Sequence, residues 1–359
     1  MVLKNPLVTV CIPVHINHEY VLRAIESVLN QNYSNIELII SINSSTFNRN
    51  EILSRLNYEL GKDIKIIDSS RVKGVSFALN CAIKSSQGEY FTWLSSDDFW
   101  HVDHLSDHVD LLKKSSDRVG LCCSGWYMIN ENDTSQQEIE FTEKEDSVVN
   151  KFLQLYSGKI MGCAVTIKRE VFKEVGLFNE ERLYTQDYEM WLRILLKYEI
   201  IFSRNLTTYY MMHSKQTTVM ENVESEVTDL WMYIIENINE TVLESTQLSK
   251  LQLILIIFES VRGSRYVSLI EMLIEEMERE LARDPHKKIS TSYLEIERLL
   301  GMQQFRKSAD VFFQLTKEIS TYGTLAHNYR LVAESKDEEL TNIYNRKVIK
   351  FLRKLRYFN

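Results

Sequence analysis

The stretch YFTWLSSDDFW, Tyr90 to Trp100, ends an apolar run with two adjacent carboxylates. Like charges side by side repel, so Asp97 and Asp98 each make the other harder to ionise. A solvated turn would relieve this repulsion, and so would a divalent cation, which prefers hard carboxylate oxygens. The stretch therefore indicates either a simple turn or a metal site at the end of a strand, and the surrounding sequence has to decide between them.

Short β-branched runs alternate with helical patterns from Leu7 to about Ser124. This alternation predicts βαβ units around a mostly parallel sheet, with helices that cover its faces. Ligands of such sheets bind beyond the carboxyl ends of the strands, which is where Asp97 and Asp98 stand. The expected strands are 8–12, 37–42, 64–67, 90–94 and 119–123, and the expected helices are 20–29, 51–60 and 76–83.

After about Val219 the pattern changes to long helices with few breakers. We therefore expect an α/β domain over residues 1–220 and an all-helical domain over residues 221–359, with loops near Asn222 and Asp284. The polar, acidic stretch 130–146 predicts an exposed loop or insertion in the first domain. The expected helices of the second domain are 223–238, 248–261, 266–282, 292–300, 305–319 and 338–355.

Composition indicates a soluble globular protein, since 44% of the 359 residues are hydrophobic and 26% are charged. The length favours two domains, and the formal net charge of −8 argues against general nucleic-acid binding. The five cysteines lack a CxxC spacing and sit mostly in apolar runs, which predicts buried reduced thiols and a cytoplasmic protein. No apolar run is long enough for a signal peptide or a membrane span.

Five segments, in order, resemble an inverting glycosyltransferase of family 2, of the bacterial type and with the Rossmann-like GT-A fold. The resemblance covers roughly Leu7 to Val219 and leaves the helical remainder outside. It implies an enzyme that moves a sugar from a nucleotide diphosphate to an acceptor hydroxyl. The segments are VTVCIPVHIN (8–17), AIESVLNQNYSNIELIISINSS (24–45), KGVSFALNCAIKSSQGEYFTWLSSDD (73–98), VFKEVGLFNEE (171–181) and TQDYEMWLRI (185–194).

The resemblance implies that Asp97 and Asp98 form a DxD-type site for Mn²⁺ or Mg²⁺, which neutralises the departing diphosphate. Ser95 replaces the family's frequent first acid, leaving fewer carboxylates. The alternative is a solvated turn or a helix cap made by Asp98. His213 falls where many relatives carry a histidine that touches the metal or diphosphate, although Met211 replaces the usual arginine. The alternative for His213 is a strand-end histidine bonded to the backbone.

Asp187 matches the general base of the family's ED motif, a carboxylate that takes the proton of the acceptor hydroxyl. Gln186 replaces the usual glutamate. The alternative is an aspartate that stabilises a helix N-terminus through the macrodipole. The resemblance also implies an acceptor site with three further residues. They are Gly162, where a side chain would block the sugar, and Trp191 and Arg193, which flank the base.

Donor recognition departs from the family pattern, because Asn43 stands where an aspartate usually meets the nucleotide base. Its amide can still accept a hydrogen bond from a pyrimidine N–H, so uridine is favoured. His15 replaces a commoner tyrosine in the first βα turn, and the alternative to a nucleotide contact is a histidine that simply stacks or hydrogen-bonds there. The donor-binding residues implied by the resemblance are Pro13, His15, Asn43, Lys73, Ser96 and Asp97.

His101, His104 and His108 share one face of the helix expected after the acidic turn. The spacing could be taken for a zinc site, but no cysteine or glutamate completes the set nearby. Aspartates interleave with the histidines, so we expect an exposed polar helix instead.

The last expected helix, residues 338–355, has an apolar face and an opposite face rich in lysine and arginine. That pattern predicts a basic amphipathic helix that contacts an anionic membrane, with each basic residue contributing about 1 kcal/mol at most. The alternative is a helix packed on the helical domain with a solvated basic face.

The sequence thus predicts a metal-dependent, inverting transferase that uses a nucleotide sugar, with UDP-sugars favoured, and a glycan, lipid-linked or protein acceptor in surface-glycan synthesis. Its helices would suit a protein acceptor or a homo-oligomer interface. The alternative is a non-catalytic scaffold that keeps the fold and binds a glycan or a partner protein. Four departures from the family pattern favour that alternative, namely Ile42, Ser95, Gln186 and Met211.

Overall fold

The structure is a computed structural model that describes residues 5–15, 20–43, 64–72, 74–131, 133–141, 150–213, 223–246, 248–261 and 267–283. The chain forms two compact units, Met1–Gln247 and Leu248–Asn359. The first unit extends beyond the expected boundary at residue 220, which lies outside the described residues. It does so because two helices after that boundary pack on earlier ones, α9 (Glu224–Glu236) on α7 (Gln186–Leu195) and α10 (Glu240–Thr246) on α5 (Asn150–Tyr156).

The first half of the first unit is a parallel sheet in the order β3-β2-β1-β4. Its strand β1 is buried on both faces, as a parallel strand between helices must be, since six of its seven residues are fully buried. Residue for residue, Cys11 of β1 pairs with Ile39 of β2 and Trp93 of β4, so the three strands end at one edge. Its elements are β1 (Val8–Val14), α1 (Tyr20–Leu29), β2 (Ile36–Ile42), β3 (Ile64–Asp68), α3 (Val75–Ser85) and β4 (Tyr90–Trp93).

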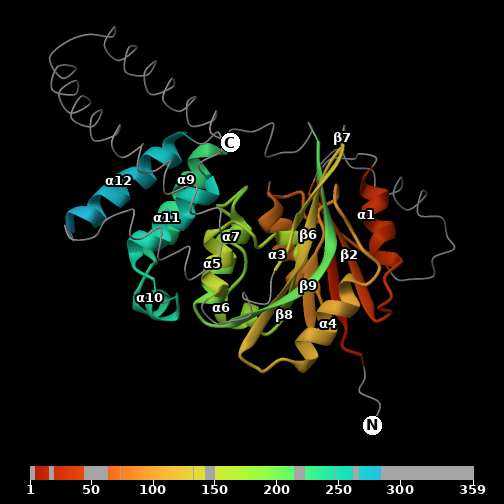
Figure 1. Cartoon of the computed structure of the whole chain (residues 1–359). Coiled ribbons are helices and arrows are strands. Elements are labelled where there is room, and N and C mark those ends of the chain that lie inside the picture. Colours follow the sequence, from red (N-terminus) through yellow and green to blue (C-terminus); the bar gives the residue numbers. More distant parts are fainter. Residues whose placement is uncertain are drawn as a thin grey trace, which may run out of the picture. The chain divides into compact units, whose positions relative to one another are not determined.

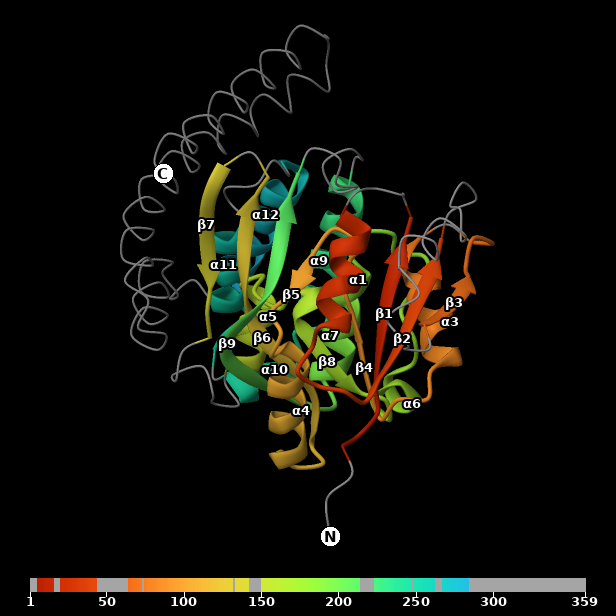
Figure 2. The same ribbon diagram turned by 90° about the vertical axis from the view of Figure 1, so that its right-hand side faces the viewer.

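The second half continues the same sheet in the order β4-β8-β6-β9-β5. Here the pairing is mixed, because β8 is antiparallel to both β4 and β6, whereas β9 is parallel to β6. Figure 2 shows the long strands β6, β9 and β7 beside the parallel half. The remaining elements are β5 (Phe99–Trp100), α4 (His104–Lys114), β6 (Val119–Asn130), β7 (Asp133–Ile139), η3 (Gly162–Ala164), β8 (Val165–Lys168), α6 (Val171–Val175) and β9 (Glu199–Met212).

The expectation of a loop over residues 130–146 is wrong for its first part. β6 runs to Asn130 and turns into β7, which pairs with it antiparallel. The polar side chains that suggested a loop belong to an exposed strand, since Gln136, Gln137 and Glu138 are exposed. Polar residues on an edge strand also discourage pairing with other chains. Residues 142–146 lie outside the described residues.

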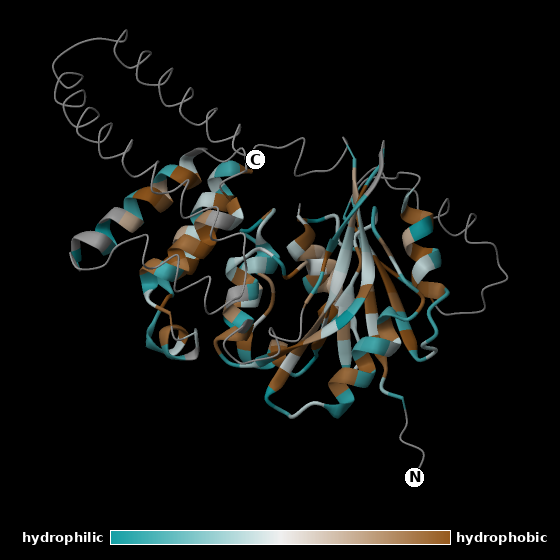
Figure 3. Ribbon diagram, in the orientation of Figure 1, coloured by the Kyte–Doolittle hydropathy of each residue, from teal (hydrophilic) through white to brown (hydrophobic). Residues whose placement is uncertain are grey.

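Helices cover both faces of the sheet, as the alternation of patterns predicted. In Figure 1 α1 and α4 lie on one side of the strands, and α3, α5 and α7 lie on the other. Figure 3 shows brown, apolar residues along the central strands and a mixture of brown and teal along α1. The helix α1 buries Val21, Ala24, Ile25 and Val28, which recur at helical spacing.

The second unit is described over two helices, α11 (Lys250–Val261) and α12 (Val267–Arg283), which pack against each other. Both were expected, within one or two residues at each end. The helices expected at 51–60, 292–300, 305–319 and 338–355, and the basic last helix, lie outside the described residues. Among the helices that the structure does describe, none has the length and apolar character needed to cross a membrane.

Candidate active site

The carboxyl ends of β1, β2 and β4 bring the expected donor-binding residues to one edge of the sheet. Pro13 lies near the end of β1 and His15 just after it, Asn43 follows β2, and the turn Ser95–Asp98 follows β4. This shared edge arises because parallel strands run the same way. Lys73 lies outside the described residues.

Asp97 forms the first centre of the site, and His213 comes to it from the end of β9. The Nε2 atom of His213 lies 3.1 Å from Oδ2 of Asp97, although the two residues are 116 positions apart in sequence. The His213 ring is nearly enclosed, with 3% of its side chain exposed, and the ring of Tyr20 lies against it at 5.1 Å. The Asp97 side chain is 23% exposed. The carboxylate thus stays accessible on one side while its histidine partner is fixed.

Asp98 has a different environment from its neighbour. Its side chain is buried, and one carboxylate oxygen accepts a hydrogen bond from the backbone N–H of Met211 at 3.0 Å. Burial, together with the charge of Asp97, raises the pKa of Asp98 well above its ordinary value. Two acids of one turn were expected to share a metal. The structure pairs only Asp97 with His213 and uses Asp98 to hold the end of β9.

Two side-chain atoms at this edge of the sheet are suited to bind a divalent cation. Within the described ranges no group of three histidine, cysteine or acidic side chains converges on one point. Oδ2 of Asp97 and Nε2 of His213 do converge, and Mg²⁺ commonly takes one or two protein carboxylates and fills its other positions with substrate phosphates and water. These two side chains therefore suit an ion that arrives with a phosphorylated substrate.

Asn43 is more constrained than a free base-reading side chain would be. Its Nδ2 donates to the carbonyls of Ser69 and Val72 at 2.8 and 2.9 Å, and its Oδ1 accepts from the N–H of Gly74 at 3.2 Å. The backbone carbonyl oxygen of Asn43 lies 2.8 Å from Nδ1 of His15. Asn43 therefore holds Ser69, Val72 and Gly74 at the edge of the site, and its direct contact with a nucleotide base stays a prediction.

Asp187 forms the second centre, in the first turn of α7. Its side chain is half-buried, and Oδ1 accepts a hydrogen bond from the N–H of Tyr188 at 2.9 Å. Burial raises the pKa of Asp187 to about 6, and the charge of Glu226 acts in the same direction. A carboxylate with such a pKa can take up a proton near neutral pH, as a general base must.

The short helix η3 joins the two centres. A Cβ atom on Gly162 would lie 3.2 Å from Oδ2 of Asp187 and 2.8 Å from the indole of Trp93. The sulfur of the next residue, Cys163, accepts a hydrogen bond from the N–H of Ser95 at 3.2 Å. The hydroxyl of Ser95 lies 3.0 Å from the same sulfur. Two consecutive residues of η3 therefore lie beside the two centres. Gly162, which has no side chain, lies next to Asp187 of α7, and Cys163 contacts Ser95 of the turn after β4.

Trp191 and Arg193, expected near an acceptor, lie behind the site. Trp191 is fully buried and stacks on Trp93 with ring centroids 5.6 Å apart. Arg193 forms two bonds to Glu189, at 2.6 and 2.7 Å, and a third to the carbonyl of Leu177 at 2.9 Å. Both side chains therefore support α7 in this structure, and their contact with an acceptor stays a prediction.

The expectation that the face of His101, His104 and His108 is exposed is wrong for two of the three. His104 and His108 are fully buried, and their Nδ1 atoms lie 2.7 and 2.8 Å from the hydroxyls of Thr207 and Thr166. Burial lowers the pKa of both, to about 3 for His108, so both are neutral. Of the aspartates that suggested a solvated face, Asp103 and Asp110 are exposed, whereas Asp107 is half-buried and accepts hydrogen bonds from Ser203 and Asn205.

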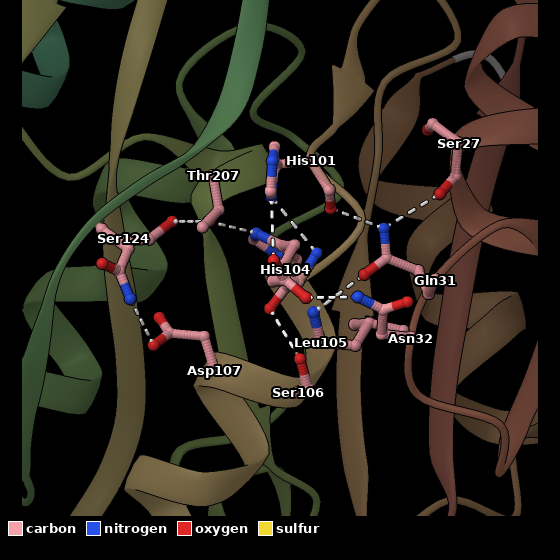
Figure 4. A network of polar contacts seen from close by, with 12 residues as sticks. Ser27, Gln31, Asn32, His101, His104, Leu105, Ser106, Asp107, Ser124 and Thr207 are labelled. Atoms are coloured by element: carbon pink, nitrogen blue, oxygen red, sulfur yellow. Dashed lines mark hydrogen bonds and ion pairs between the residues drawn. The ribbon is translucent and has the colours of Figure 1, made fainter.

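Figure 4 shows why this face is inward: the start of α4 is bonded to elements on both sides. The amide of Gln31 donates to the carbonyls of Ser27 and His101, and accepts from the N–H of Leu105. The hydroxyl of Thr207, next to His104, donates to Ser124. The histidines are thus part of a buried polar network and not of a metal site.

Two residues that contact the site, Cys163 and Glu226, were not predicted from the sequence to be part of it. Cys163 was treated as a buried thiol, although its place beside Gly162 could have suggested contact with the acidic turn. Glu226 lies in α9, beyond the segments with a recognisable pattern, and its carboxylate binds the residues that precede Asp187. Only the folded chain brings it there.

Comparison with known proteins places these features in a family. Residues 9–176 match the model of Glycosyl transferase family 2. An uncharacterized glycosyltransferase of Rickettsia prowazekii, RP339, is 30% identical over 240 residues, which are 66% of this chain and 74% of the relative. One of Rickettsia felis is 34% identical over 242 residues, again 66% of this chain, but the match spans only 39% of that longer protein.

A functionally named relative is the UDP-Glc:alpha-D-GlcNAc-diphosphoundecaprenol beta-1,3-glucosyltransferase WfaP of Escherichia coli. It is 29% identical over 217 residues, covering 58% of this chain and 78% of WfaP.

Solved structures share the fold. S. aureus TarS 1-349 in complex with UDP-GlcNAc has a TM-score of 0.56 at 14% identity, covering 90% of this chain and 92% of that one. The mannosyltransferase PcManGT of Pyrobaculum calidifontis, in complex with GDP-Man and Mn²⁺, has a TM-score of 0.52 at 14% identity, covering 86% and 84%. The expected GT-A-like α/β fold is confirmed.

Proposed function

This chain belongs to glycosyltransferase family 2, and we propose that it is an inverting, metal-dependent transferase with Asp187 as its general base. The observation that supports the proposal is that two unlike carboxylates lie in segments on either side of η3. Asp97 lies beside His213 in the turn whose Ser95 contacts Cys163, and Asp187 lies beside Gly162, which has no side chain. A donor diphosphate at the first centre and an acceptor hydroxyl at the second would lie on opposite sides of one transferred sugar.

Asp187 suits the role of base through its environment. It must be ionised to accept the acceptor's proton, and it must hold that proton well enough to assist the attack. Its burial, together with the negative charge of Glu226, provides the second property by raising its pKa. Attack by the activated hydroxyl from the side opposite the diphosphate would invert the sugar's anomeric centre in one step.

Asp97 and His213 are the residues that we assign to Mn²⁺ or Mg²⁺. When bound, the ion would offset the negative charge that gathers on the departing diphosphate. Asp98 supports this pair, because its bond to the N–H of Met211 fixes the strand end that carries His213. Cys163 supports it from the other side by holding Ser95.

Donor and acceptor are proposed from relatives. WfaP is named for UDP-Glc and a lipid-linked acceptor, and TarS has been solved with UDP-GlcNAc, so a UDP-sugar donor is favoured. We accordingly propose a glycan, lipid-linked or protein acceptor in surface-glycan synthesis at the cytoplasmic face of the cell membrane. Membrane contact through the last helix and homo-oligomerisation through the helical part stay predictions.

Slow transfer of the sugar to water provides a test that needs no acceptor. A panel of UDP-, GDP- and dTDP-sugars is incubated with the full chain, with Mn²⁺, with Mg²⁺ and with EDTA, and released nucleoside diphosphate is measured. We expect hydrolysis of a UDP-sugar that requires metal and is lost in Asp187→Asn. Nucleotide binding without hydrolysis of any donor, in the presence of candidate acceptors as well, would favour the non-catalytic scaffold.

A further inference from the structure

The segment that leads into the base helix is held from outside by other elements. We call residues 176–185, between α6 and α7, the base loop. On one side Asn80 of α3 donates to the carbonyl of Phe178 at 2.9 Å and accepts the N–H of Phe178 at 3.0 Å. Ser76, one turn earlier in α3, donates to the carbonyl of Arg182 at 2.9 Å. The donor side of the sheet therefore fixes the first part of the loop.

Glu226 of α9 holds the last part of the base loop. Its Oε1 accepts the N–H groups of Tyr184 and Thr185 at 2.8 and 2.9 Å and the hydroxyl of Thr185 at 2.9 Å. Its Oε2 accepts the N–H of Leu183 at 3.1 Å. One carboxylate thus satisfies four donors on three consecutive residues, and charge-assisted bonds of this kind are the stronger ones.

Glu226 also holds the capping residue of α7. Thr185 is the residue before the helix, yet its side chain makes no capping bond to the helix backbone and is turned to Glu226. A capping residue usually uses its side chain to accept an N–H group of the helix's first turn. Here that side chain and the N–H of Thr185 are both bound by a residue 41 positions later in the chain.

The residues that Glu226 fixes connect Asp187 to the donor edge of the sheet. Asp187 is two residues after Thr185. Leu183 packs on Gly74, since a Cβ atom added to Gly74 would lie 3.1 Å from the Leu183 side chain. Gly74, at φ +122°, also donates to Asn43 of the donor edge. A shift of the base loop would therefore move the base and the wall of the donor edge together.

We propose that Glu226 is a positioning residue for catalysis, which sets the base loop and through it the place of Asp187. The inference rests on the proposed function of Asp187 as base. Glu226 lies beyond residues 9–176, so this task falls to a helix outside the matched family region. Its charge also acts on the base directly, in the direction that favours proton uptake.

The test compares Glu226→Gln, which keeps the shape and removes the charge, with Glu226→Asp and with Asp229→Asn. Asp229 is exposed on the same helix, so its variant controls for charge alone. We expect Glu226→Gln to lower kcat for donor hydrolysis roughly tenfold to a hundredfold, because small misplacements of a catalytic group have effects of that size. Donor KM should change less than kcat, and melting temperature should fall only slightly.

The pH profile separates positioning from a purely structural role. The titratable groups that face Asp187 are Glu226 from α9 and Tyr188 from α7, while η3 and β4 present Gly162 and Trp93, which do not titrate. Removal of the Glu226 charge should lower the pKa of Asp187, so the acidic limb of kcat should move to lower pH in Glu226→Gln. It should stay in place in Asp229→Asn, and Glu226→Asp should recover part of the rate.

The outcomes distinguish the two proposals. A wild-type chain that hydrolyses no donor overturns the proposed function. If the wild type is active and Glu226→Gln keeps kcat within twofold, with the acidic limb of its pH profile at the same pH, the positioning role is overturned. Amide exchange at Leu183, Tyr184 and Thr185, with titration of Asp187 followed by carboxyl NMR, gives a readout without activity. Unchanged exchange and an unchanged titration midpoint in Glu226→Gln would also overturn it.

Discussion

The turn after β4 and the first turn of α7 both lie beside η3 and both carry a carboxylate of the proposed site, but the protein surrounds these two carboxylates differently. Asp97 has a histidine 3.1 Å away and an open side, an environment that suits a cation. Asp187 has no such partner among its described contacts, and burial raises its pKa to about 6. The environment of Asp97 thus suits the binding of a cation, and the environment of Asp187 suits the uptake of a proton. Different environments can give identical side chains separate roles in one reaction.

The largest expected effect tests the proton-holding side. Asp187→Asn keeps the size of the side chain but cannot take a proton, so sugar transfer should fall by about 10² to 10⁴. Binding of UDP, measured by calorimetry, should stay within a few-fold, because the proposed base acts on the acceptor and not on the nucleotide. The exposed Asp117→Asn serves as a control for the loss of one charge. A loss below tenfold with an intact fold would place the base elsewhere and remove the contrast.

The next effect tests the cation-holding side. At UDP concentrations of 100 times Kd, binding should stabilise the folded state by about 2.7 kcal/mol, and Mn²⁺ should increase the shift by tightening UDP binding. Asp97→Asn and His213→Ala should each remove the increment due to metal, while Asp187→Asn should keep it. Thermal shift with UDP, with and without Mn²⁺, measures this. Equal shifts with and without metal in the wild type would exclude the ion from this edge.

A third effect sharpens the comparison through pH. Asp187 acts as a base only when ionised, so kcat should fall about tenfold per pH unit below its pKa of about 6. The sign for stability is the opposite. The folded pKa lies above the unfolded value of about 3.9, so folding favours the protonated acid and the stability it contributes is lost as pH rises through 6. Asp187→Asn should therefore melt higher than wild type at pH 8, with the difference vanishing near pH 4.

The smallest effect concerns η3, where the two regions meet. Gly162→Ala would place a Cβ 2.8 Å from Trp93, which is buried against Trp191 and cannot easily move. Overpacking of this kind costs roughly 1–3 kcal/mol, visible in denaturant melts. Gly158→Ala is the matched control, since its φ of +74° is strained for alanine but its Cβ has room. Both should lose stability, and only Gly162→Ala should also alter the rate at equal folded fraction.

Local pattern was sufficient for most of the fold. The strands around Val10, Ile40 and Phe91 were expected because β-branched and aromatic runs alternate with helical spacing. β7 was missed because its Gln136–Glu138 stretch is polar, and an edge strand can expose such residues without loss. The helix of His104 was expected, but its inward face was not, because each buried histidine is matched to a threonine hydroxyl from a distant strand.

The sequence by itself showed two acids at the end of an apolar run, and its resemblance to a family marked Asp97, Asp187 and Gly162 as candidates for the site. A strand end can be recognised locally, because an apolar run and the polar residues after it are adjacent in the chain. Only the tertiary structure decided what surrounds each acid. It paired Asp97 with His213, turned Asp98 to Met211, and gave Asp187 its raised pKa and its link to Glu226. Desolvation and charge act through space, so they depend on residues that the chain brings together only when it folds.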